Sequence, residues 1–445
     1  MDLFALLPSF GGILFTVAVF VIALSVIVAV HEYGHYIVGR WCGIKAEVFS
    51  IGFGPVLVSR MDRRGTRWQV AALPFGGYVK FLGDADAASG KDDTVLDSIE
   101  ADRRRHTMHG APLWARSATV AAGPVFNFIL SVLIFGAFFL IRGVAIDAPV
   151  IGEVKPLPTP VQELQPGDRI HAVEGRPVED IASLRAAADE ILPAETVLYD
   201  VERNEQRQEL RGPFPFPPIA DTVHPQSAAQ DAGMRAGDVI LSIDGISVYG
   251  FGELRDIVGE SEGRPLLLEL WRDGETLEVT LNPRSIDIPR PEGGFETRWL
   301  IGLNGGLFFE PQTRRAGPLE AVGMGAAQTW FVVETSLSGL YHMVIGAIST
   351  CNLRGPVGIA EVSGATAAQG IGAFIWFIAV LSTAVGLLNL FPIPVLDGGH
   401  LVFHAYEAVV GRPPSDGALR ALMAVGLALL LTLMAFALTN DFLCP

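Results

Sequence analysis

The sequence has no lysine or arginine in its first 39 residues, and its first basic residue is Arg40. A cleavable signal peptide carries positive charge before its apolar segment, so we expect the first apolar segment to be retained. Three cysteines, Cys42, Cys351 and Cys444, are too few and too scattered to indicate a zinc cluster or a disulfide framework. The net charge of −16, without a dense basic patch interleaved with aromatics, excludes nucleic acid as the expected partner.

Long apolar runs are what the sequence does contain. Half of its 445 residues are hydrophobic, and the mean hydropathy is +0.39. Four runs are long enough to cross a bilayer: residues 11–30, 117–141, 371–391 and 418–438. A fifth run, residues 318–349, is interrupted by charged and polar side chains, which predicts an amphipathic helix lying along the membrane.

The distribution of charge predicts how these segments are oriented. Residues 40–116 carry 12 Lys and Arg against 9 Asp and Glu, whereas residues 143–320 carry 16 against 31. Short basic loops mark the cytoplasmic side, and a long domain can be translocated whatever its charge. We therefore expect both termini and the acidic region to lie outside, and residues 40–116 to lie in the cytoplasm.

The acidic region contains an internal repeat. Residues 165–178 and 235–248 align at an offset of 70, with Gly167 matching Gly237 and Asp168 matching Asp238. Each copy predicts a turn, a short strand, a tight glycine turn, a helix and further strands, forming a small mixed sheet with an open edge. The second copy resembles PDZ domains, which accept an extended peptide as an added strand. Spacers or steric shields are the alternative interpretation.

The motif HEYGH follows the first apolar run directly. Residues four apart share one face of a helix, so His31 and His35 can present two nitrogens to one Zn²⁺, with Glu32 beside them. Zinc lowers the pKa of a bound water towards about 7, and a neighbouring carboxylate can then accept its proton. This chemistry is peptide hydrolysis without a covalent intermediate. The alternative is that the histidines only pack or contact lipid headgroups.

A catalytic zinc needs a third protein ligand, which we expect at the same membrane side. The third run ends in NLFPIPVLDGGH, where prolines and glycines interrupt the helix, and Asp397 lies there. We favour Asp397 as the ligand. His400 and His404 form a second pair four residues apart and remain competing candidates.

Residues 47–60 and 66–81 of the cytoplasmic loop have a β-rich pattern that predicts a hairpin dipping into the membrane beside the metal. Irregular backbone is tolerated at that depth only where protein shields it or where it lines a wet cavity. Since peptide bonds inside a helix are inaccessible to hydrolysis, an edge strand of this hairpin could hold a substrate extended. An ordinary cytosolic hairpin is the alternative.

Six short motifs follow one another along the chain: HEYGH at 31–35, GFGP at 52–55, GGY at 76–78, GPVFN at 123–127, GP at 355–356 and NLFPIPVLDGG at 389–399. Together they closely resemble the site-2 protease family over nearly the whole chain. The resemblance implies that His31, His35 and Asp397 are zinc ligands, that Glu32 is the general base, and that Asn389 contacts the unwound substrate backbone. We also assign Gly52, Phe53 and Gly54 to substrate binding.

We therefore predict a polytopic α-helical membrane protein with four transmembrane helices, a membrane-dipping β-hairpin and two inserted PDZ-like α/β domains. The predicted parts are residues 1–142 with the first two helices, 143–215 and 216–290 with the PDZ-like domains, 291–370 with a linker and the amphipathic helix, and 371–445 with the last two helices.

The function implied is that of an intramembrane zinc metalloprotease in a bacterial inner membrane. It would cleave single-pass membrane proteins near the cytoplasmic face, such as anti-sigma factors already trimmed outside and remnant signal peptides. Its partners would be these substrates, membrane lipid and an extended peptide at the PDZ-like domains, which would lie in the periplasm. A membrane-anchored PDZ adaptor and a zinc transporter or sensor are the rival interpretations.

Overall fold

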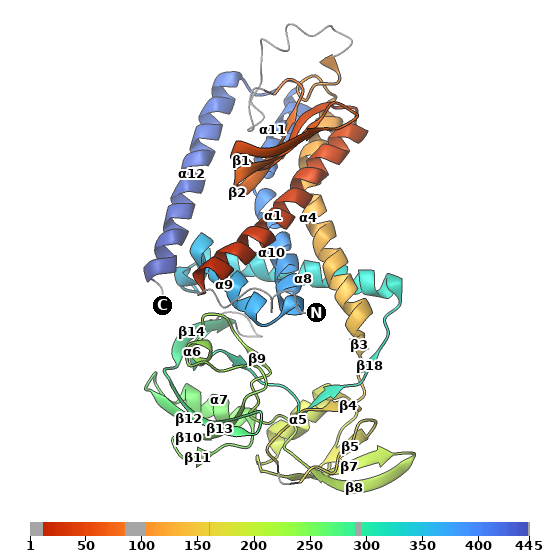
Figure 1. Ribbon diagram of the computed structural model, residues 1–445, viewed down its shortest axis with the longest axis vertical. Coiled ribbons are helices and arrows are strands. Elements are labelled where there is room, and N and C mark those ends of the chain that lie inside the picture. The colour runs from red at the N-terminus through yellow and green to blue at the C-terminus, as the bar shows by residue number, and fades with distance from the viewer. Residues whose placement is uncertain (1–11, 85–103, 160, 290–294, 444–445) are drawn as a thin grey trace. The chain divides into compact units, whose positions relative to one another are not determined.

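The computed structural model describes residues 12–84, 104–159, 161–289 and 295–443, and its chain divides into two compact units (Figure 1). Unit 1 comprises Met1–Ala137, Pro318–Ile345 and Thr350–Pro445. Unit 2 comprises Phe138–Gly317 and Gly346–Ser349. We describe each unit by itself.

Four helices of the described chain are long and apolar enough to cross a membrane, which confirms the number of spans expected from the sequence. Each expected apolar run overlaps one of them. The first helix continues for eleven residues beyond the run at 11–30, so the HEYGH motif lies within an unbroken helix. The four are α1 (Ile13–Trp41), α4 (Leu113–Arg142), α10 (Ile371–Asn389) and α12 (Asp416–Leu443).

The run at 318–349 forms helix α8 (Pro318–Val344), which is not among the candidate spans of the described chain. Figure 1 shows α8 running across the direction of α12. Small residues let it cross α4 closely, because a Cβ on Gly325 would lie 2.4 Å from the Val132 carbonyl oxygen. The placement of α8 along a membrane surface stays a prediction.

The expected hairpin is present as strands β1 (Ala46–Met61) and β2 (Arg67–Phe81). Both strands bend, so residues 48–51 of β1 pair with 67–70 of β2 on one side and with 77–80 on the other. The turn is stabilised by the Asp62 carboxylate, which accepts hydrogen bonds from the backbone N–H groups of Arg64 and Thr66. Tyr36 of α1 donates to the same carboxylate and ties the hairpin to the helix.

Helix α9 (Pro356–Ala368) begins at a contact with the end of α12. The Asp441 carboxylate accepts hydrogen bonds from the backbone N–H groups of Gly355 and Val357, so a distant side chain caps this helix.

The cysteines of the described residues differ in state. Cys351, just before helix α9, is disulfide-bonded, whereas Cys42 is a free thiol. The number and spacing of the cysteines did not indicate this disulfide. Cys444 lies outside the described residues.

Unit 2 contains two copies of one four-stranded sheet, which confirms the duplication. The strand orders are β6-β5-β7-β8 and β11-β10-β12-β13, and the helices α5 and α7 occupy equivalent places in sequence. Every pairing in both sheets is antiparallel, so the expectation of mixed sheets is wrong. The elements are β5 (Arg169–Val173), β6 (Arg176–Pro177), α5 (Ile181–Glu190), β7 (Val197–Arg203), β8 (Gln206–Gly212), β10 (Val239–Ile243), β11 (Ile246–Ser247), α7 (Phe251–Gly259), β12 (Leu266–Arg272) and β13 (Glu275–Leu281).

The repeated Gly-Asp turn has the same function in both copies. Asp168 is buried and accepts two 2.6 Å hydrogen bonds from the Arg203 guanidinium, and Asp238 accepts bonds of 2.7 and 2.6 Å from Arg272. Paired, two-point contacts of this kind satisfy a carboxylate that burial would otherwise destabilise. The sequence repeat therefore preserves an ion pair as well as a fold.

Residues 295–314 were predicted to form a linker. They instead include three short strands, here called return strands, which pair with strands that precede the two copies of the repeat. β16 (Leu303–Asn304) pairs with β9 (Thr222–Val223), and β17 (Phe309–Pro311) pairs with β4 (Ile151–Val154). The last return pair joins β18 (Thr313–Arg314) to β3 (Val144–Ala145). These strands are two or three residues long and pair with distant sequence, so no local pattern announces them.

A further hairpin of β14 (Arg284–Pro289) and β15 (Phe295–Leu300) precedes these strands. Two of the return strands pair with β3 and β4, which precede the first copy, and the third pairs with β9, which precedes the second copy. The last strands of unit 2 therefore lie beside its first strands.

Candidate metal centre

Helix α1 brings the two histidines of the HEYGH motif onto one face. Their Nε2 atoms are 3.2 Å apart, and the rings meet nearly edge to face. Both side chains are largely buried, with 12 and 13% of their surface exposed. Two imidazoles so close, with the same nitrogen facing inward, are arranged to share one ion.

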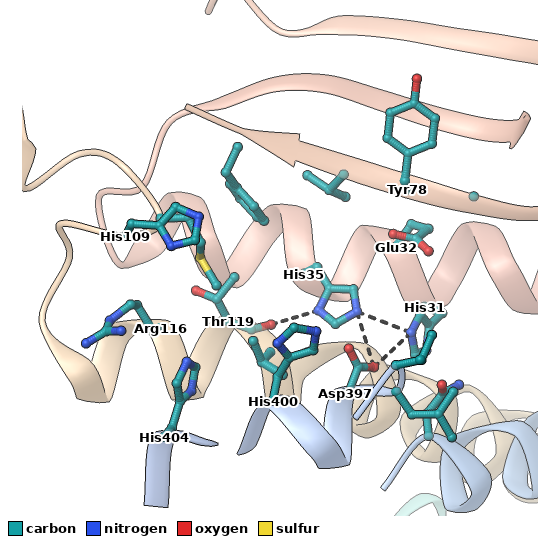
Figure 2. Close-up of a pocket in the computed structure, with 18 of the residues that line it drawn as sticks. His31, Glu32, His35, Tyr78, His109, Arg116, Thr119, Asp397, His400 and His404 are labelled. Atoms are coloured by element: carbon teal, nitrogen blue, oxygen red, sulfur yellow. Dashed lines mark hydrogen bonds and ion pairs between the residues drawn. The ribbon is translucent and has the colours of Figure 1, made fainter. Parts of the chain in front are cut away.

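Asp397 reaches the same point from the other end of the sequence. It is the first residue of helix α11 (Asp397–Val410), which starts after the proline-containing turn at the end of α10. A Cβ on Gly398 or Gly399 would lie 2.3 Å from backbone oxygens of that turn, so only glycine permits the chain to reverse this tightly. The turn places Asp397 Oδ2 at 3.2 Å from His31 Nε2 and 3.5 Å from His35 Nε2 (Figure 2).

The three atoms lie close to the separations expected of ligands around a tetrahedral zinc ion. With zinc bonded to nitrogen and oxygen at about 2.0–2.2 Å, ligand atoms in a tetrahedron lie about 3.3–3.6 Å apart. The separations here are 3.2, 3.2 and 3.5 Å, and these residues are the one metal-binding group of three found in the described chain. The donor set of two imidazoles and one carboxylate also suits zinc, and leaves a fourth position for water.

Helix α4 supports the imidazoles from behind. The backbone carbonyl oxygen of Thr119 lies 2.8 Å from His35 Nδ1, so this nitrogen donates a hydrogen bond to it and Nε2 is left available to bind a metal. Gly34 of α1 permits the close approach of the two helices, because a Cβ there would lie 2.5 Å from the Ala122 carbonyl oxygen. The imidazoles themselves fill the space over Gly123.

Replacing Gly123 by alanine should disrupt the metal centre. The new Cβ would lie 2.3 Å from His35 Nε2 and 2.8 Å from His31 Cε1, so both rings must move. We expect at least a tenfold loss of zinc affinity, measured by competition with a chelator, because ligand geometry controls metal binding. Gly323→Ala is the matched control, since nothing lies within 4 Å of its Cβ in helix α8. Equal affinities in the two variants would contradict this prediction.

Glu32 is held between α1 and the hairpin. Its carboxylate lies near the Val79 backbone N–H of β2. Gly77 makes room for it, because a Cβ there would lie 2.9 Å from Glu32 Cγ. The same side chain lines a cavity of about 290 Å³ together with His31, His35 and Asp397 (Figure 2). The general base expected from the motif thus has access to the space where a water would react.

The competing ligands His400 and His404 line the same cavity without joining the metal-binding group. They lie on α11 beyond Asp397, and His404 Nδ1 is 3.2 Å from the Ser117 hydroxyl of α4. Burial, together with the nearby Arg116 guanidinium, lowers the pKa of His404 to about 4, so its imidazole is neutral at pH 7.

An ion pair fastens α11 to α4 near this point. The Arg116 guanidinium donates two hydrogen bonds, of 3.1 and 2.5 Å, to the two oxygens of Glu407, and both side chains are mostly buried. Two-point pairing fixes orientation as well as distance. This contact holds the helix that carries Asp397 against the helix that supports His35.

Only some of the residues expected to bind substrate line the metal cavity. Asn389 lines the metal cavity, and its side-chain amide donates to the Val385 carbonyl oxygen of its own helix. Gly52, Phe53 and Gly54 lie at the bend of β1 and do not line that cavity. Phe53 stacks on Tyr78, which does line it, at 5.9 Å between ring centroids.

Sequence reasoning missed the supporting residues Thr119, Gly123 and Arg116. Gly123 belongs to the GPVFN motif, which was noted without a role. Thr119 contributes a backbone oxygen, which no side-chain pattern can reveal. Arg116 and Glu407 are 291 residues apart, so only the fold pairs them.

Comparison with known proteins identifies the family. The profile of Peptidase family M50 matches residues 19–433. The chain belongs to Peptidase family M50. This membership confirms the resemblance to the site-2 proteases that the motifs indicate. A protein of Agrobacterium fabrum, named as a candidate zinc metalloprotease, is 38% identical over 426 residues, covering 95% of this chain and 94% of that protein. The regulator of sigma-E protease of Salmonella typhimurium is 34% identical over 462 residues, covering 97% of this chain and 99% of that protein.

Proposed function

We propose that this member of Peptidase family M50 is an intramembrane zinc endopeptidase that cleaves single-pass membrane proteins. The observation that carries the proposal is the meeting of His31, His35 and Asp397 at zinc-ligand separations beside Glu32. Relatives named zinc metalloproteases match nearly the whole chain, which supports zinc as its cofactor.

In the proposed reaction, His31, His35 and Asp397 would hold zinc, which would supply Lewis-acid activation of water and of the peptide carbonyl. The Glu32 carboxylate accepts the proton of the attacking water and passes it to the departing amide nitrogen. Glu32 lines the cavity beside Val79 of β2. Peptide hydrolysis in this form needs no covalent intermediate on the enzyme.

The substrate would bind as an extended strand beside the metal. Gly77, Tyr78, Val79 and Phe81 of β2 line the metal cavity, and no strand of the described residues pairs with the edge opposite β1. An added strand at such an edge exposes its peptide bonds, whereas a helix buries them. Asn389, at the cavity, would contact the unwound backbone. Gly52, Phe53 and Gly54 would contribute through the bend of β1 that supports Tyr78.

We assign the protein to a bacterial inner membrane, with the metal centre towards the cytoplasm and unit 2 in the periplasm. The basic loop at 40–116 favours this orientation. The cysteines provide independent support, because disulfides persist in oxidising compartments and thiols in reducing ones. Cys351 is disulfide-bonded, while Cys42, at the cytoplasmic end of α1, is free.

The two repeated domains of unit 2 would act as PDZ-like modules. A cavity of about 390 Å³ lies between α7 and β15, lined by Arg255 and Gly259 of the helix and by Arg298 and Trp299 of the strand. β14 occupies one edge of β15. An extended peptide added at the other edge, or exclusion of bulky external domains, would connect unit 2 to substrate choice. The remaining division into domains stays a prediction.

The substrates would be membrane proteins whose external parts have already been removed, such as trimmed anti-sigma factors, and remnant signal peptides. The similarity to a regulator of sigma-E protease supports the first class.

Removal and return of zinc tests the proposal. The purified full-length protein in detergent should cut a tagged single-span substrate, lose this activity after treatment with a chelator, and regain it with one equivalent of zinc. A substrate that keeps a bulky external domain serves as the comparison for trimming. Cleavage that survives complete removal of the metal would refute the zinc mechanism, and would favour a contaminating protease or another chemistry.

A further inference from the structure

The buried side chain of Asn127 contacts a proposed zinc ligand from the side opposite the metal. Asn127 lies on α4, one turn beyond Gly123, and is fully buried. Its amide nitrogen is 3.2 Å from His31 Nδ1. Asn127 is the one hydrogen-bonding group that meets this ring nitrogen in the described part of the chain. Asn127 is the last residue of the GPVFN motif.

The ligand geometry determines what His31 Nδ1 needs. His31 Nε2 faces His35 and Asp397 at 3.2 Å, so Nε2 is the nitrogen available to a metal. A neutral imidazole that binds metal through Nε2 carries its proton on Nδ1, which then donates a hydrogen bond. His35 satisfies the same requirement through the Thr119 carbonyl oxygen at 2.8 Å. His31 therefore requires an acceptor, and Asn127 is at the required position.

Asn127 has an acceptor available. Its side-chain oxygen Oδ1 is buried without a hydrogen-bond partner, which is costly for a polar atom. A half-turn about the Cβ–Cγ bond exchanges the amide nitrogen and oxygen within nearly the same volume. The oxygen then lies at the place of the nitrogen and accepts the proton of His31 Nδ1.

The backbone of Asn127 is fixed. Its carbonyl oxygen accepts hydrogen bonds from the Ser131 hydroxyl at 3.0 Å and from the Ser382 hydroxyl of α10 at 2.9 Å. Gly386 of α10 also packs closely, because a Cβ there would lie 3.1 Å from Asn127 Cβ. The amide can rotate, but its Cβ cannot move away from His31.

We propose that Asn127 is a positioning residue that accepts a hydrogen bond from His31 Nδ1, and so selects the ring tautomer and orientation that bind zinc. This inference rests on the proposed zinc site. It assigns to α4 the support of both histidines, through the backbone at Thr119 and through the side chain at Asn127.

Two substitutions in the full-length protein test the role of the acceptor. Asn127→Leu keeps the approximate shape and removes the acceptor, and should weaken zinc binding by about 10- to 100-fold, the usual effect of losing such a contact. Asn127→Asp provides an anionic acceptor and should bind zinc several-fold more tightly than wild type. Ser382→Ala is the matched control, because it removes only a hydrogen bond to the Asn127 backbone, and its affinity should stay within about threefold of wild type.

The measurements are zinc dissociation constants, from competition with a chelator, and the visible absorption of the cobalt-substituted protein. The spectrum reports ligand geometry, so it should change for Asn127→Leu and not for Ser382→Ala. Circular dichroism of the metal-free variants checks that each remains folded.

Zinc affinity and cobalt absorption of Asn127→Leu equal to those of wild type would overturn the inference. Equal weakening in the leucine and aspartate variants would also overturn it, because packing rather than the acceptor would then explain the loss. Should Asn127→Leu unfold, the aspartate variant decides alone, and binding no tighter than wild type refutes the role. Failure of wild type itself to bind zinc would instead refute the proposed function.

Discussion

Replacing Glu32 by glutamine is expected to lower the rate of substrate cleavage by about 10²- to 10⁴-fold, the range that a positioned general base contributes. Glutamine has nearly the same shape as glutamate, so it fits the same space between α1 and the hairpin. It cannot accept a proton from water. Glu32 is not part of the three-residue metal-binding group, so zinc content should be unchanged.

The measurement is cleavage of a tagged single-span membrane protein by the purified variant in detergent, beside its zinc content. Equal zinc content in the variant and wild type makes the lost rate a chemical effect. A Glu32→Gln protein that cuts at the wild-type rate would rule out the proposed mechanism. The adaptor and transporter interpretations would then be favoured, because neither needs this carboxylate.

Replacing Asp397 by asparagine is expected to lower zinc affinity by more than about 100-fold. Loss of a residue that only supports a metal ligand lowers affinity by about 10- to 100-fold, and Asp397 is itself a proposed ligand. The substitution removes the negative charge that compensates the ion and leaves two neutral imidazoles as strong ligands. Activity at limiting zinc should fall with the affinity. Competition with a chelator measures the first effect, and the same cleavage reaction measures the second.

His400→Asn is the matched control for Asp397, since it removes the competing ligand three residues along the same helix. His400 lines the cavity outside the metal-binding group, so its loss should leave zinc affinity within a few-fold of wild type. The opposite result, in which His400→Asn binds zinc weakly and Asp397→Asn binds it as tightly as wild type, would assign the third ligand to His400. Loss in both variants would indicate that the turn after α10, rather than one ligand, had been damaged.

Local patterns predicted the helices and the repeat well. Apolar runs of about 20 residues identify membrane spans because lipid requires continuous apolar surface and internally satisfied backbone. The repeat was visible because both copies need the same Gly-Asp turn. Its buried carboxylate then meets an arginine from the equivalent strand of each copy, Arg203 or Arg272.

Short strands and long-range contacts could not be predicted in the same way. Strands β16 to β18 are two or three residues long and pair with residues 80 to 170 positions away, so their positions follow from the partner and not from their own composition. The cap that Asp441 provides for helix α9 is of the same kind, because its carboxylate contacts backbone N–H groups 86 and 84 residues away.

The sequence by itself determined the chemistry of the candidate centre. His31, Glu32 and His35 are within five residues, so helical geometry alone gathers them, and the turn with Asp397 was the favoured third position. Tertiary structure alone decided that Asp397, rather than His400 or His404, lies at zinc-ligand separations from both imidazoles. It also decided that α4 supports the two rings through Thr119 and Asn127. Metal geometry is set by tenths of an ångström between separate helices, and only their packing fixes distances of that size.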